Sequence, residues 1–223
     1  MTMVLGYNFG EEAAIFCDSR GSWEIKPNQY LPKDALQKIL PLGKRSLIGY
    51  AGNVSIAIQI VNKIKQKILK NSNFTHIEKL VKYIPKISKR YSAKNKEVEF
   101  ILAGINSKSK IEIWSFRHPL FSPVLVSDFE VIGSGEVVKK YVEDNKKKFS
   151  KKSIKEKTDA LVIGVSNELD GLNIDTVGGM LQVLIIDNKG IRPYKYGHID
   201  INPAAGSSNA KSIDFENGVW TQE

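Results

Sequence analysis

Three residues in the first part of the chain have side chains suited to nucleophilic chemistry: Thr2, Asp18 and Lys38. A hydroxyl becomes a nucleophile when neighbouring groups take its proton and favour its charged form. Asp18 ends the second predicted strand, where a hairpin would return it to the side of Thr2. Lys38 lies on the next predicted strand. The hairpin therefore predicts a carboxylate beside the Thr2 hydroxyl, with a lysine on the strand that follows.

Three later positions lie where predicted strands meet turns. Gly52 follows a strand and precedes a helix, so its N–H is available to bind an anion. Ser134 supplies a hydroxyl at a second strand–turn–helix junction, Ile-Gly-Ser-Gly. Asp175 begins the segment Asp-Thr-Val-Gly-Gly, which precedes the last predicted hairpin. These positions add an anion site, a hydroxyl and a second carboxylate to the first three.

Taken together, these residues resemble the proteasome-like N-terminal-nucleophile hydrolases, specifically the β-type peptidase subunits. The resemblance covers residues 2–195, which is most of the chain. The spacings from Thr2 to Asp18, from Lys38 to Gly52 and from Gly52 to Ser134 match the family. Several matching spacings are a more specific signal than any one motif. The lack of a helical extension before Thr2 is similar to β-type subunits and unlike the noncatalytic α-type.

The resemblance implies a threonine-type endopeptidase whose nucleophile is the hydroxyl of Thr2 once Met1 is removed. The α-amine of Thr2 would be the base, since an α-amino group has an unperturbed pKa of about 7.7 to 8.0. Lys38 would favour the ionised hydroxyl, and Asp18 would keep Lys38 charged and oriented. The Gly52 N–H would stabilise the oxyanion of the tetrahedral intermediate.

The same resemblance assigns supporting and substrate-binding residues. Ser134 and Asp175 would hydrogen-bond the α-amine, although the segment at Asp175 is one residue shorter than the family's Asp-x-x-Ser-Gly-Gly and lacks its serine. Asp170 is the alternative carboxylate, and Thr176 could replace the missing hydroxyl. The segment between Asp18 and Lys38 is longer than usual, which would reshape the substrate pocket. The residues that would line this pocket are Leu40, Tyr50 and Val54, for which packing in the core is the other interpretation.

Each single residue also has a purely structural interpretation. Asp18 could bind backbone N–H groups in a turn, Lys38 could be a surface lysine, and Gly52 could simply permit a tight turn. Two other functions also stay open: a noncatalytic, ring-forming scaffold of the same fold, and an amidohydrolase that acts on a small amide. The state of the N-terminus separates the first of these from a peptidase, because a retained Met1 would block the amine.

Composition limits the cofactors and partners. The chain has 223 residues and one cysteine, Cys17, so an internal disulfide or a Cys-x-x-Cys zinc site is excluded, and we expect no cofactor or metal. With no secretory signal and no apolar run of about 20 residues, we expect a cytoplasmic protein that does not bind membranes. The net charge of +9 comes mostly from dispersed lysines, which makes nucleic acid an unfavoured partner. The family implies a peptide or unfolded-protein substrate, a homo-oligomeric ring and, as an open question, an ATPase or other gating partner.

Hydrophobic periodicity predicts strands, two helices, strands, two helices and a final hairpin. The expected fold class is α+β, a four-layer αββα sandwich of two antiparallel sheets flanked by helix pairs. Residues 1–201 would form this domain, and residues 202–223 a mobile or partner-dependent tail. The predicted helices cover 54–70, 75–90, 134–148 and 153–169, the last opened by a Ser153–Glu156 capping box. The predicted strands cover 2–9, 13–18, 37–42, 46–51, 97–105, 110–116, 124–126, 129–132, 181–187 and 191–195, with 19–33 irregular.

Overall fold

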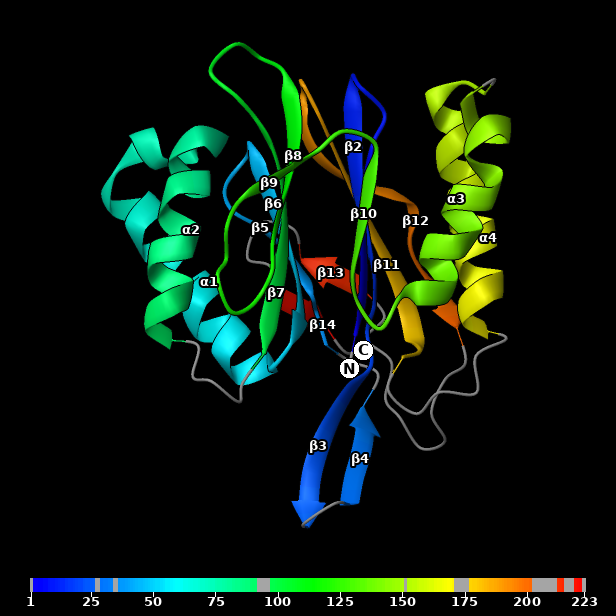
Figure 1. The fold of residues 1–223 in the computed structure, drawn as a ribbon, viewed down its shortest axis with the longest axis horizontal. Helices are drawn as coiled ribbons and strands as arrows, with labels where there is room; N and C mark the ends of the chain where they lie inside the picture. Colours follow the sequence, from blue (N-terminus) through cyan, green and yellow to red (C-terminus); the bar gives the residue numbers. More distant parts are fainter. Residues whose placement is uncertain are drawn as a thin grey trace.

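The computed structural model describes residues 2–26, 29–33, 36–91, 97–150, 152–170, 177–201, 212–214 and 219–221. Within these ranges the chain forms two antiparallel five-stranded sheets that face each other, with a pair of helices outside each sheet (Figure 1). This arrangement confirms the predicted four-layer αββα sandwich. No described helix combines the length and the apolar character of a membrane span.

The first sheet contains the N-terminal strand between two other strands. Its strand order is β10-β1-β2-β11-β12, and β1 pairs with both β10 and β2. Helices α3 (Glu136–Ser150) and α4 (Ile154–Asp170) cover its outer face (Figure 1). The strands are β10 (Phe129–Gly133), β1 (Met3–Asn8), β2 (Glu12–Asp18), β11 (Gly179–Asp187) and β12 (Gly190–Ile201).

The second sheet has the order β5-β6-β7-β8-β9. Helices α1 (Val54–Lys70) and α2 (Ile77–Tyr91), joined through the 3-10 turn Ser72–Thr75, cover its outer face (Figure 1). Strands that are adjacent in this sheet are also consecutive in sequence. The helix pair α1–α2 lies between β6 and β7. The strands are β5 (Ile39–Pro41), β6 (Ser46–Gly52), β7 (Val98–Ile105), β8 (Ile111–Phe116) and β9 (Val124–Val126).

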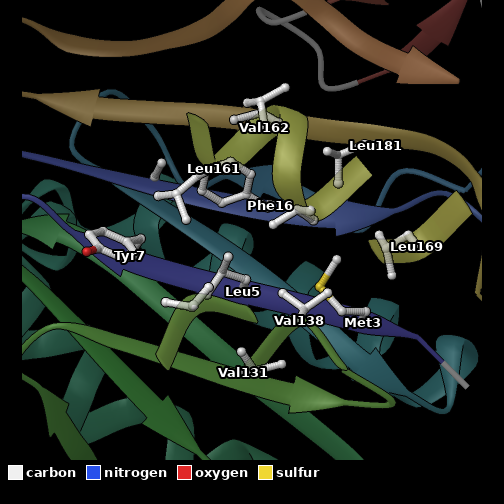
Figure 2. Close-up of a cluster of buried hydrophobic side chains, with 14 of the residues drawn as sticks. Met3, Leu5, Tyr7, Phe16, Val131, Val138, Leu161, Val162, Leu169 and Leu181 are labelled. Atoms are coloured by element: carbon white, nitrogen blue, oxygen red, sulfur yellow. The ribbon is translucent and has the colours of Figure 1, made fainter. Parts of the chain in front are cut away.

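Both faces of the central strands are buried, which is why their sequences are almost continuously apolar. Along β1, Met3, Leu5 and Tyr7 pack toward α3 and α4 in one hydrophobic cluster (Figure 2). Val4 points the other way, into the cluster between the two sheets. A third cluster lies between the second sheet and the α1–α2 pair. The alternation fixes the register of β1, because a shift of one residue would exchange the two faces.

The structure confirms some of the predicted element boundaries and corrects others. The capping box of α4 is confirmed: the Ser153 hydroxyl and N–H donate to Glu156, whose own N–H donates to Ser153 Oγ at 3.3 Å. Helix α3 begins at Glu136, two residues later than predicted. Residues 19–33 are not wholly irregular, because β3 (Gly21–Lys26) and β4 (Gln29–Lys33) pair as a ribbon that projects from the sandwich (Figure 1). Within the predicted tail, β13 (Ser212–Asp214) pairs with β14 (Val219–Thr221).

Candidate active site

The carboxylate of Asp18, at the end of β2, is the hub of the candidate site. Its side chain is fully buried, and Oδ1 accepts the Met3 N–H at 2.9 Å. Oδ2 accepts the Lys38 ammonium at 3.1 Å and two further backbone N–H groups, from Arg20 at 3.2 Å and Gly178 at 3.3 Å. Burial raises the pKa of Asp18, while the Lys38 cation and the N–H groups of Met3 and Gly178 act in the opposite direction. The carboxylate therefore joins β1, the segment before β5 and the start of β11.

Lys38 is a completely buried lysine just before β5. Its ammonium group donates to Asp18 and also to the backbone carbonyl of Arg20. An ammonium group without such partners would be strongly unfavourable inside a protein. The predicted contact is present, and it fixes a positive charge beside the carboxylate that also binds the Met3 N–H at the start of β1.

Thr2 lies directly before β1 with only 4% of its surface exposed. Its carbonyl oxygen accepts the Ser134 N–H at 2.8 Å, so the β10–α3 junction is bound to the N-terminal segment. Gly133, with a φ of +73°, makes this approach feasible, because a Cβ there would lie 1.8 Å from the Thr2 oxygen. Since the N–H of the next residue, Met3, is bonded to Asp18, the structure brings Thr2, Asp18, Lys38 and Ser134 together.

Gly52 lies at the adjoining end of β6. Its φ is +93°, and a Cβ there would lie 2.3 Å from the Glu97 carbonyl oxygen, so the position requires glycine. The next residue, Asn53, caps α1 by accepting the Ile56 N–H at 3.1 Å. The preceding residue, Ala51, also contacts the Gly133 position, where its Cβ would be 2.9 Å from an added Cβ. The end of β6 therefore lies beside the junction that holds Thr2.

The three residues assigned to a substrate pocket pack in or against the cluster under α1 and α2. Tyr50 is a core side chain, 1% exposed, and its hydroxyl donates to the Gln37 carbonyl at 3.0 Å. Burial raises the pKa of Tyr50 well above its ordinary value. Leu40 and Val54 are half-buried and contact the same cluster. Their placement agrees with the core-packing interpretation, and their role in binding a substrate stays a prediction.

The second predicted carboxylate has two candidates, Asp175 and Asp170. Asp175 and Thr176 belong to 171–176, which lies outside the described residues. Asp170 is the last residue of α4. Among the side chains that the structure does describe, no three of the histidine, cysteine, aspartate and glutamate type gather where a metal ion could bind.

Gln182, in the middle of β11, is a site residue that the sequence prediction missed. It is 1% exposed, and its Oε1 accepts the Lys38 backbone N–H at 3.2 Å and the Cys17 thiol at 3.4 Å. Its amide nitrogen donates to the Leu36 carbonyl at 2.6 Å. One side chain thereby fixes the segment that carries Lys38. The sequence does contain a signal for this residue, because Gln182 is a glutamine within an otherwise apolar strand. A buried amide in such a strand needs hydrogen-bond partners.

We expect Gln182→Met to reduce the free energy of unfolding by about 2 to 4 kcal/mol, because the Lys38 N–H and the Leu36 carbonyl would both lose a buried partner. Urea unfolding measures this loss. The matched control is Gln59→Met at an exposed position of α1, which should change stability by less than about 0.5 kcal/mol. Equal effects of the two substitutions would show that Gln182 does not fix this segment.

Comparison with models of known protein families and with curated proteins finds no match to this chain.

Proposed function

We propose that the chain is a proteasome β-subunit-like threonine peptidase that cleaves peptide bonds through Thr2, with its α-amine freed by removal of Met1. The observation that carries this proposal is the carboxylate of Asp18, which binds the Lys38 ammonium at 3.1 Å and the N–H that follows Thr2 at 2.9 Å. Lys38 is fully buried, so it is not the surface lysine of the structural interpretation. It suits a site where a hydroxyl must lose its proton.

In the proposed reaction, Thr2 Oγ1 attacks the carbonyl carbon of a peptide bond and its proton moves to the Thr2 α-amine. The Gly52 N–H stabilises the negative oxygen of the tetrahedral intermediate. The carbon–nitrogen bond then breaks as the amine returns the proton to the leaving nitrogen, which leaves an ester on Thr2. Water cleaves this ester: the amine takes one proton from the water and Oγ1 recovers it. Lys38 favours the negative charge on Oγ1, and Asp18 orients Lys38.

The resemblance to β-type subunits also leads us to propose a homo-oligomeric ring that encloses the active face. Its substrates would be peptides or unfolded proteins, which an ATPase or another gating partner would admit.

The proposal requires a free α-amine on Thr2. It is therefore tested by comparing two forms of the chain, one with this amine free and one with it blocked. The chain can be produced behind a fusion partner that a processing protease removes either directly before Thr2 or one glycine earlier. The form that begins at Thr2 should hydrolyse fluorogenic peptides, and the form with the extra glycine should show background rates, because its Thr2 nitrogen is an amide without basicity. Equal rates for the two forms would contradict an N-terminal nucleophile and favour another site.

The contact between Gly133 and Thr2 predicts a positional effect on this activity. Gly133→Ala should lower kcat by about 100-fold, because the new Cβ must displace the Thr2 carbonyl and reactive groups tolerate little misplacement. Gly43→Ala is the matched control: its φ of +82° imposes similar backbone strain, but nothing lies within 4 Å of the added Cβ. If both variants keep full kcat per folded molecule, the β10–α3 junction does not position the nucleophile.

A further inference from the structure

The charge of the protein is concentrated on one of its two helix layers. The layer formed by α1, α2 and their connection, residues 54–91, carries nine basic residues and a single acidic one, Glu78. The opposite layer, residues 136–170, also carries nine basic residues, but seven acidic ones are mixed among them. The first layer therefore accounts for most of the net charge of +9. The two layers lie on opposite outer faces of the sandwich (Figure 1).

Most of these cations are presented to solvent. Seven of the nine are exposed and two, Lys65 and Lys67, are half-buried. Between described residues, the recorded ion pairs, such as Lys146–Asp128 and Arg192–Glu12, all lie elsewhere. Along α2, like charges follow one another at helical spacing, which is unfavourable in the isolated chain. The exposed residues are Lys63, Lys70, Lys79, Lys82, Lys86, Lys89 and Arg90.

Two large apolar side chains lie on the same layer. Leu69 is 87% exposed and Ile58 is 40% exposed, and both belong to α1. Their separation corresponds to about three helical turns, so they share one stripe of the helix. A single exposed apolar side chain is common on protein surfaces, but burial against a partner would add its apolar area to a contact made by the surrounding charges.

We propose that the α1–α2 layer is a docking surface for another protein whose matching surface is rich in carboxylates around an apolar centre. Complementary charge would relieve the repulsion within the layer, and the contact would also cover Ile58 and Leu69. A second copy that presents one of its helix layers does not fit, because each of these layers carries a net positive charge. Nucleic acid fits less well, since eight of the nine cations are lysines and the layer's aromatic rings, Phe74, Tyr83 and Tyr91, are half-buried.

The inference is independent of the proposed peptidase activity and is tested by binding. Three labelled probes of equal charge are compared by fluorescence anisotropy: a Glu-Glu-Leu-Glu repeat peptide, polyglutamate and a short DNA duplex. At about 150 mM salt the leucine-containing peptide should bind most tightly, because only it can use both the cations and the apolar stripe. Leu69→Ser should weaken that peptide alone, by about tenfold.

Charge reversal locates the surface. We expect peptide binding to weaken by more than about tenfold when four lysines of the α1–α2 layer are changed to glutamate: Lys63, Lys79, Lys82 and Lys86. The same reversal at Lys139, Lys140, Lys152 and Lys155 of the opposite layer gives a protein of identical net charge and should change binding less than about threefold. Equal losses in the two quadruple variants would overturn the proposal, because net charge alone would explain them. Tightest binding of the duplex, or no effect of Leu69→Ser, would also overturn it.

Discussion

Thr2→Ala is expected to reduce peptide hydrolysis by at least about 1,000-fold, because removing a catalytic nucleophile leaves only the residual effects of binding and oxyanion stabilisation. The side chain is nearly buried but small, so the folded structure should persist with a loss of only about 1 kcal/mol in stability. Thr2→Ser keeps the hydroxyl and should retain activity within about tenfold. The measurement is kcat/KM for a fluorogenic peptide at matched concentrations of folded protein.

Controls on the folding and assembly of Thr2→Ala identify the cause of its lost activity. Circular dichroism and size-exclusion chromatography of Thr2→Ala should match the wild type, which would exclude unfolding or loss of assembly as the cause. If Thr2→Ala keeps more than about a tenth of the activity, a different nucleophile carries the reaction. Activity toward a small amide but not toward a peptide, lost in Thr2→Ala, would retain the nucleophile and replace the substrate.

Lys38→Met is expected to affect both stability and activity. Removing the ammonium leaves the fully buried Asp18 carboxylate without its cation, which should cost about 3 to 5 kcal/mol of unfolding free energy. Activity should fall by about 100-fold or more, since the charge that favours the ionised hydroxyl is lost. Denaturant unfolding and peptide hydrolysis measure the two effects.

The double variant Lys38→Met with Asp18→Asn separates the two roles. It removes both charges, so much of the stability should return, while the activity should stay absent because no cation remains beside Thr2. Recovery of activity together with stability would indicate that the pair is purely structural. A double variant as unstable as the single one would contradict the ion-pair account.

The instability of Lys38→Met should also depend on pH in a defined direction. The Lys38 cation lowers the pKa of Asp18, so its removal raises that pKa further above the unfolded value of about 3.9. A group whose pKa is raised in the folded state stabilises the fold when protonated, and this contribution is lost as the pH rises through the folded pKa. The stability deficit of Lys38→Met relative to wild type should thus be smallest near pH 4 and grow toward neutral pH.

Local sequence signals were sufficient for most elements of the fold. Helix α1 has the predicted bounds, Val54–Lys70, because its apolar residues recur at helical spacing and Asn53 caps its first turn. The β3–β4 ribbon was missed because Gly21, Pro27 and Pro32 indicated an irregular segment. A two-stranded ribbon tolerates Pro32, since each of its strands is an edge.

The candidate site was predictable only in part, because its contacts join distant segments. The Asp18–Lys38 contact was expected from the resemblance to the N-terminal-nucleophile hydrolases, and the structure contains it. The bond from the Lys38 N–H to Gln182 spans 144 residues and depends on the position of β11 beside β2. No local pattern specifies that register. The catalytic role of these residues stays a prediction, as does the role of Leu40, Tyr50 and Val54 in binding a substrate.

The most direct test of the central claim is the intact mass of the purified protein before and after treatment with a peptide epoxyketone, which reacts with the hydroxyl and the α-amine of an N-terminal threonine. The proposal predicts a mass that lacks Met1, followed by a single covalent adduct that Thr2→Ala does not form. A folded protein that lacks Met1 and forms no adduct, or an adduct that persists in Thr2→Ala, would contradict it. A mass that retains Met1, with no adduct, would also contradict it and favour the noncatalytic scaffold.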